Sequence, residues 1–128
     1  MPVEKIVGTQ FAFEKIGVKR LEDFMPAKIH PQTYMSDGGV RCLLTSAVLV
    51  PEPTNPYDRF AVGVHVRLRD GSVVRIGWLS KQGWLHQLHT QQRLGAYLHN
   101  RPVFVVVKAY SEIANISDSY EIVVAERA

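Results

Sequence analysis

The sequence predicts a mainly β protein, a small antiparallel barrel of about six strands with one or two short helices. Apolar and polar residues alternate in several short segments, turn-forming residues separate these segments, and helix-like spacings are few and short. The chain has 128 residues, of which 46% are hydrophobic and 21% charged, close to the average of globular proteins. We therefore expect one folded domain spanning residues 1–128.

The N-terminal third predicts a strand, a short helix and a loop. The strand begins at Val3 and places on one face Val7, Thr9, Phe11 and Phe13. A helix-like spacing over residues 13–25 ends before Pro26, because the residue before a proline is disfavoured in the α conformation. Residues 26–39 contain the turn sequence Asp37-Gly38-Gly39 and predict a loop, whereas Val40 to Val50 predict a well-buried strand.

A β-hairpin is predicted around Asp70-Gly71-Ser72. On its first strand the apolar residues alternate with Gly63, His65, Arg67 and Arg69. A strict two-residue loop would pair Val66 with Arg75 and mix the two faces. We favour a three-residue loop or a bulge that pairs Arg67 with Arg75, because a one-residue slip would cost the burial of a whole face. In this register Trp78 lies on the apolar face with Ile76.

The C-terminal part predicts helices followed by two strands. Ser80 is expected to be the N-cap of a helix that carries Trp84, Leu85 and Leu88. The polar run at residues 90–92 interrupts this stripe, and a second short helix carries Leu94, Tyr97 and Leu98. The last two strands are expected from Pro102 (VFVVVKAY) and over Tyr120 to Ala125.

The composition limits the class of protein. No apolar run reaches the roughly 18 residues of a membrane span, and MPVEKIVG lacks the apolar region of a signal peptide. The expected location is cytoplasmic, or nuclear in a eukaryote, with neither secretion nor membrane attachment. Cys42 is the only cysteine, so an internal disulfide is excluded and a buried inert thiol is expected.

Basic residues are concentrated in the middle of the chain. From Arg59 to Lys108 there are eight Lys or Arg residues and one acid, Asp70, so this segment carries 8 − 1 = +7 in a chain of net charge +3. Such an asymmetry indicates an anionic partner, although a scattered solvated surface is an equally good interpretation.

No pattern typical of an enzyme is present. The chain has no nucleophile elbow, phosphate-binding loop or paired acidic metal motif, so we expect neither catalysis nor a cofactor. His86 and His89 could share a helix face, but no third metal ligand is evident. They are expected to be solvated, and a nuclease that uses either histidine is the remote alternative.

The stretch PEPTNPYDRFAV, residues 51–62, places Tyr57 and Asp58 side by side in a turn. In one interpretation Asp58 closes an Asx turn and Tyr57 lies over the edge of the core. In the other, flanking prolines hold a rigid loop that presents the two side chains as a recognition pair.

The runs AVLVPEPTNPYDRFAVGV, GSVVRIGWLSKQ and IVGTQF resemble the HIRAN domain family over most of the chain. The resemblance implies a free-standing HIRAN-domain protein with an OB-like barrel that binds single-stranded DNA at free 3′-hydroxyl ends. The sequence departs from the family pattern at Phe60, where an Asn is usual, and over residues 15–39, which do not align closely.

The resemblance also implies which residues bind DNA. The end-binding pair falls on Tyr57 and Asp58, in a loop shaped by Asn55 and Pro56. Gln10 and Phe11, after the first strand, match a position that contacts DNA in the family. The family's G-x-L-x-K pattern matches Gly77, Trp78, Leu79 and Lys81, of which Trp78 and Lys81 are expected to bind DNA. His65, Arg67 and Arg75 are expected to line one face of the hairpin, either to neutralise phosphates or only as the wet side of a sheet.

Together these features predict a single-stranded DNA-binding module acting in DNA repair, at replication forks or on mobile elements. A helicase or nuclease is the candidate protein partner. The alternative is an interaction module whose NPYD loop binds a peptide from a DNA-processing partner.

Overall fold

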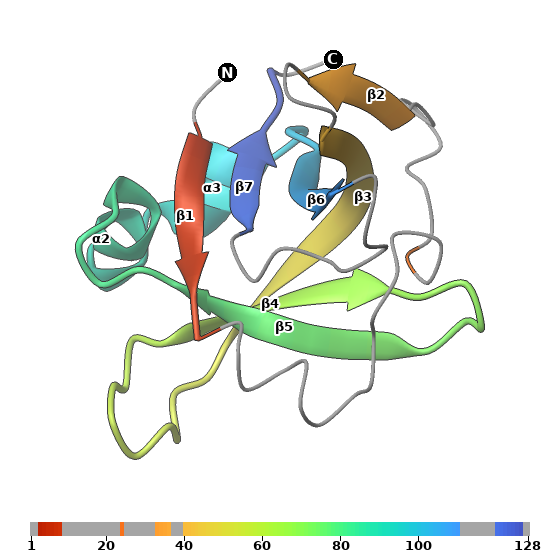
Figure 1. Ribbon diagram of the computed structural model, residues 1–128. Helices are drawn as coiled ribbons and strands as arrows, with labels where there is room; N and C mark the ends of the chain where they lie inside the picture. Colours follow the sequence, from red (N-terminus) through yellow and green to blue (C-terminus); the bar gives the residue numbers. More distant parts are fainter. Residues whose placement is uncertain (1–2, 9–23, 25–32, 37–39, 111–119, 127–128) are drawn as a thin grey trace.

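The computed structural model describes residues 3–8, 24, 33–36, 40–110 and 120–126 (Figure 1). Among these residues there are seven strands and two helices. They are β1 (Val3–Val7), β2 (Thr33–Ser36), β3 (Val40–Pro51), β4 (Val62–Arg67), β5 (Val73–Leu79), α2 (Trp84–Thr90), α3 (Leu94–Leu98), β6 (Val103–Tyr110) and β7 (Glu121–Val124).

Six of the described strands close into an antiparallel barrel in the order β3-β4-β5-β1-β7-β6. Closure depends on β3, which is 12 residues long. Its second half pairs with β4 over residues 47–51, and its first half pairs with β6 over residues 40–46. The predicted fold class, mainly β with short helices, is confirmed.

Two expectations for the region before the hairpin are wrong. The segment expected to be a loop contains β2, whose Thr33–Ser36 pair with Leu43–Val40 of β3. The strand expected to be well buried is exposed on its outer face, where Val48 is 61% and Val50 38% accessible. Strand pairing is decided by a distant partner, and apolar content alone does not show which face a partner covers.

The β4–β5 hairpin turns at Arg69-Asp70-Gly71, where the Leu68 N–H donates to the Ser72 carbonyl over 2.8 Å. Arg67 therefore lies opposite Val73, and His65 lies opposite Arg75. The predicted Arg67–Arg75 pairing is wrong by two residues, although His65, Arg67 and Arg75 do share the outer face.

A register shift between Val64 and His65 decides where Trp78 lies. On the turn side of the shift Val66 is opposite Val74, and beyond it Gly63 is opposite Trp78. Ile76 is fully buried, whereas Trp78 joins Gly63 on the outer face. The expectation that Trp78 shares a face with Ile76 is wrong, because a bulge inverts the alternation that a regular strand would keep.

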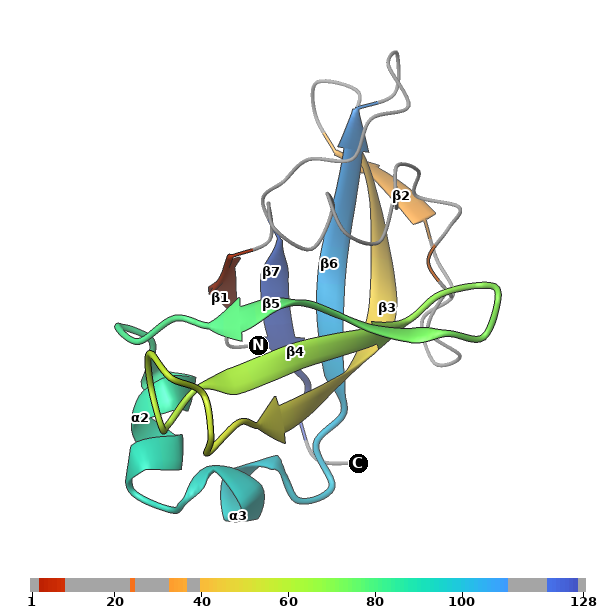
Figure 2. The ribbon, with the colours of Figure 1, turned by 90° about the horizontal axis from the view of Figure 1, so that it is seen from below.

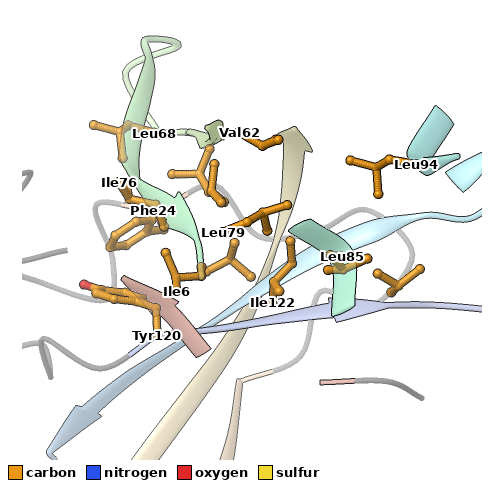
Figure 3. Close-up of a cluster of buried hydrophobic side chains, with 14 residues drawn as sticks. Ile6, Phe24, Val62, Leu68, Ile76, Leu79, Leu85, Leu94, Tyr120 and Ile122 are labelled. Carbon is orange, nitrogen blue, oxygen red and sulfur yellow. The ribbon is translucent and has the colours of Figure 1, made fainter. Parts of the chain in front are cut away.

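The core fills the barrel, and its buried side chains come from β1, β4, β5, β6, β7 and both helices (Figure 3). Ala47 and Leu49 of β3 are partly buried against it. Its fully buried members are Ile6, Phe24, Val62, Val64, Val66, Ile76, Leu85, Val105, Tyr120, Ile122 and Val124. Phe24 forms a β-bridge with Leu68, in a segment predicted to be helical; the rest of that predicted helix lies outside the described residues. On β1 the inward residue is Ile6, and Val7 is 42% exposed on the outer face.

Both described helices lie at one end of the barrel, away from β2 (Figure 2). The N-cap of α2 is Gly83, without a side-chain hydrogen bond, so the expectation for Ser80 is wrong. Ser80 instead forms a turn that ends at Gly83. A backbone N–H group at the start of α2 finds its acceptor on β1, where Glu4 Oε1 accepts a 3.0 Å hydrogen bond from the Leu85 N–H.

Candidate nucleic-acid interface

An open groove of about 1110 Å³ lies on the outside of the barrel, between the β3–β4 loop and the end of β5. Its wall combines apolar and aromatic side chains with polar and charged ones. Its lining includes Val7, Gly8, Val50, Glu52, Asn55, Tyr57, Asp58, His65, Arg75, Trp78 and Lys81. Apolar surface with polar groups set among it is typical of ligand sites.

The loop that forms one wall is held by its own side chains. Asn55 Oδ1 accepts hydrogen bonds from the N–H groups of Tyr57 (2.9 Å) and Asp58 (3.2 Å). Asp58 Oδ1 accepts one from the Phe60 N–H at 2.9 Å, which is an Asx turn. The loop is thus fixed without help from the Tyr57 ring, which is 90% exposed and does not cover the core.

Asp58 also ties the loop to helix α2. Its Oδ2 lies 2.8 Å from Nε2 of His86, whose side chain is only 9% exposed. Burial alone would raise the pKa of Asp58, but the hydrogen bonds from His86 and Phe60 and the nearby positive charges hold it below its ordinary value of 3.8. The expectation that His86 is solvated is therefore wrong.

His89, one helical turn further, contacts the same loop. Its ring meets the Phe60 ring edge-to-face, with centroids 6.2 Å apart, and the Arg59 guanidinium lies 4.8 Å from the Phe60 centroid. Phe60 is thus a packing contact between the loop and α2. Among the described residues no group of three or more His, Cys, Asp or Glu side chains could hold a metal ion.

Glu52 joins the loop to β5. Its Oε1 accepts hydrogen bonds from Asn55 Nδ2 and Trp78 Nε1, each 3.1 Å long, and its Oε2 accepts one of 2.8 Å from Arg75. Burial alone would raise the pKa of Glu52, but these three donors and the Arg75 charge hold it below its ordinary value of 4.5. Glu52 is therefore ionised at neutral pH, and both of its carboxylate oxygens accept hydrogen bonds.

Two glycines permit the close approach of these side chains. A Cβ at Gly63 would lie 2.6 Å from Glu52 Oε2 and 3.1 Å from Arg75 Cδ. A Cβ at Gly8, whose φ is +74°, would lie 2.6 Å from the six-membered ring of Trp78. A side chain at Gly8 would meet the indole and a strained backbone, and one at Gly63 would push the ends of Glu52 and Arg75 aside, so both glycines leave room for this cluster.

The charges around the groove nearly balance. Glu52 and Asp58 are negative, Arg75 and Lys81 are positive, and all four line it. Burial lowers the pKa of His65 below its ordinary value of 6.5, and the Arg75 charge lowers it further against the opposing charge of Glu52. His65 is thus neutral at pH 7, and the groove offers stacking surfaces more than net positive charge.

Comparison with known proteins gives one likeness. No protein-family model matches the chain, and no curated protein matches it. Among solved structures the chain is similar to the HIRAN domain of human HLTF, with 16% identity over 96% of this chain and 73% of that chain, and a TM-score of 0.40. The function proposed for this chain therefore rests on the residues of its own groove.

The structure brings most of the sequence-predicted site residues together. Those that line the groove are Asn55, Pro56, Tyr57, Asp58, His65, Arg75, Trp78, Leu79 and Lys81. Arg67 is exposed on the same outer face of β4 but lies outside the groove. Gln10 and Phe11 lie outside the described residues.

The basic middle segment does not form one patch. Arg93 is the N-cap of α3, and the Arg101 guanidinium lies 4.7 Å from the Tyr97 ring centroid, so both belong to the helical end. Arg75 is neutralised by Glu52. Only Lys81 lines the groove without an ion pair among the described residues.

Sequence reasoning missed Glu52, Gly63 and His86. Glu52 stands directly before the loop, and its partner Trp78 is 26 residues away. His86 meets Asp58 across 28 residues. The only available signal was an acidic residue next to a turn that already had its own Asp.

None of the helices in the described part of the chain has the length and hydropathy to span a membrane.

Proposed function

We propose that this chain binds single-stranded DNA in the groove and prefers strands that end in a free 3′-hydroxyl. The observation that carries the proposal is Tyr57, an aromatic side chain 90% exposed on a loop fixed by side-chain hydrogen bonds. An exposed aromatic ring is a stacking surface for any base, worth about 1–3 kcal/mol per base. Because the loop is already ordered, binding has little conformational entropy to lose there.

Asp58 supports the preference for a 3′-hydroxyl. Each of its oxygens already holds one donor, from Phe60 and from His86. An ionised carboxylate has about four lone-pair sites, so it can accept one further hydrogen bond from a terminal hydroxyl. A terminal phosphate offers no such donor when fully ionised and adds negative charge.

The expected discrimination is large enough to measure. Two unit charges 4 Å apart interact by about 4 kcal/mol at an effective dielectric constant of 20. Even a quarter of that repulsion is a several-fold difference in affinity. Lys81 lines the same groove and is placed to meet a backbone phosphate.

A peptide is the second candidate ligand, favoured by the balanced charge and the apolar part of the groove. Val7 and Val50 are 42% and 38% exposed and both line it. Such a surface suits an uncharged peptide as well as a nucleobase.

The test is fluorescence anisotropy with one labelled strand, competed by unlabelled strands of the same sequence. We expect competition in the order 3′-hydroxyl, 3′-phosphate, duplex, and no effect of a 5′-phosphate. Asp58→Asn should bring the two 3′ ends closer in affinity, because it removes the repulsion and leaves an amide. Equal competition by both 3′ ends would contradict end recognition, and absence of single-strand binding would favour the peptide.

A further inference from the structure

Arg75 lines the groove, and two contacts fix its guanidinium group. Its carbon Cζ lies 4.4 Å from the centroid of the Trp78 ring, and its NH1 donates a 2.8 Å hydrogen bond to Glu52 Oε2. The ion pair and the cation–π contact together hold the guanidinium over the indole.

The indole beneath it is fixed as well. Trp78 Nε1 donates to the same Glu52 carboxylate, and Gly8 lies against its six-membered ring. Glu52 thus anchors both layers of a guanidinium–indole stack and, through Asn55, the loop that carries Tyr57.

The stack presents a surface to the groove. Arg75 lines the groove, and its side chain remains 42% exposed despite its contacts with Trp78 and Glu52. Unpaired bases stack on guanidinium planes as they do on aromatic rings.

We infer that Arg75, held over Trp78 by Glu52, forms a second base-stacking position in the groove, distinct from the Tyr57 ring. The inference rests on the proposed binding of single strands. It assigns Arg75 the role of a stacking surface rather than a phosphate contact, and Glu52 that of a positioning residue. A phosphate would have to compete with Glu52 for a guanidinium whose charge is already paired.

The stacking role and the phosphate role predict opposite results for Arg75→Lys. Lysine keeps the positive charge but loses the plane, so a phosphate contact would survive and a stacking surface would not. The matched control is Arg67→Lys, on the outer face of the neighbouring strand β4 and outside the groove. Both arginines are exposed, so neither change threatens the core.

The experiment measures the affinity of wild type and variants for an oligothymidine of about ten nucleotides, within the range of single-strand site sizes, at several salt concentrations. We expect Arg75→Lys to weaken binding about 5- to 100-fold with an unchanged salt slope. Arg67→Lys should bind as wild type does. Glu52→Gln should weaken binding and steepen the salt slope by about 0.7, because it releases Arg75 to meet a phosphate.

The inference would be overturned if Arg75→Lys bound with wild-type affinity and the salt slope of Arg75→Ala were about 0.7 shallower than that of wild type. The proposed binding of single strands would then still stand. A wild-type protein that binds no oligothymidine would overturn both the proposed function and the inference. Thermal unfolding of each variant identifies any loss that comes from misfolding. If Glu52→Gln does not fold, the two lysine variants still decide the inference.

Discussion

Two aspartates close two similar turns in this barrel, yet within the described part of the chain only one of them has a partner beyond its turn. Asp58 accepts a 2.9 Å hydrogen bond from the N–H two residues ahead, and Asp70 accepts one of 2.8 Å in the same way. Among the described residues Asp70 otherwise bonds only the Ser72 hydroxyl, and it is exposed in the β4–β5 turn. Asp58 reaches a buried histidine on α2.

The difference shows how a turn becomes part of a site. A hairpin turn needs only its local hydrogen bonds, and these connect the two strands and nothing else. The Asp58 turn is fixed from its base by Glu52 and from its side by His86, so its tip is free to present Tyr57. The same local chemistry is structural at Asp70 and positions a candidate ligand contact at Asp58.

The largest expected effect is on stability. Asp58→Ala leaves His86 buried without its partner, which costs about 1–3 kcal/mol of unfolding free energy. Asp70→Ala removes only solvent-exposed hydrogen bonds and should leave the denaturation midpoint unchanged. Urea denaturation of the two variants checks both outcomes, and equal losses would show that the His86 contact contributes nothing.

A smaller effect is expected in the pH dependence of stability. The pKa of Asp58 is lower in the folded protein than its ordinary value of 3.8, so its ionised form stabilises the fold. This contribution is complete above that ordinary value and is lost as the pH falls through the lower, folded-state pKa.

Asp58→Asn should flatten the curve of unfolding free energy against pH in this acid range, because asparagine does not titrate. Asp70→Asn should leave the curve as in wild type. Its pKa is also lowered, but by Ser72 two residues away, a contact that the unfolded chain forms in part. A curve for Asp58→Asn as steep as that of wild type would assign the acid sensitivity to other groups.

Features that depend on residues close together in the chain could be predicted from the sequence, whereas contacts between distant residues could not. The Asx turn offered in one interpretation of Asp58, the alternation along β4 and the short α3 helix depend on residues close together in the chain, and the structure contains all three. The position of the bulge that moves Trp78 outward was not predictable, because Gly77 and Arg75 fit either register and only packing in the closed barrel selects one. Glu4 capping α2 across 81 residues is hidden for the same reason.

The smallest expected effect concerns local motion. The Phe60 amide, bonded to a carboxylate that His86 restrains, should exchange with solvent several-fold more slowly than the Ser72 amide. His86→Ala should reduce this difference without altering Ser72, and hydrogen exchange by NMR measures both amides in one sample. Unchanged exchange at Phe60 in the variant would mean that the turn is held by its local bonds alone.

The most direct test of the groove as the binding site uses the two tryptophans of the chain, Trp78 and Trp84. Trp78 lines the groove, whereas Trp84 lies on α2 with its ring 5.0 Å from the Tyr97 centroid. We expect the indole N–H resonance of Trp78 to shift during titration with a single strand bearing a 3′-hydroxyl, while that of Trp84 stays in place. A shift confined to Trp84, or none at either indole at saturating strand, would contradict binding in this groove.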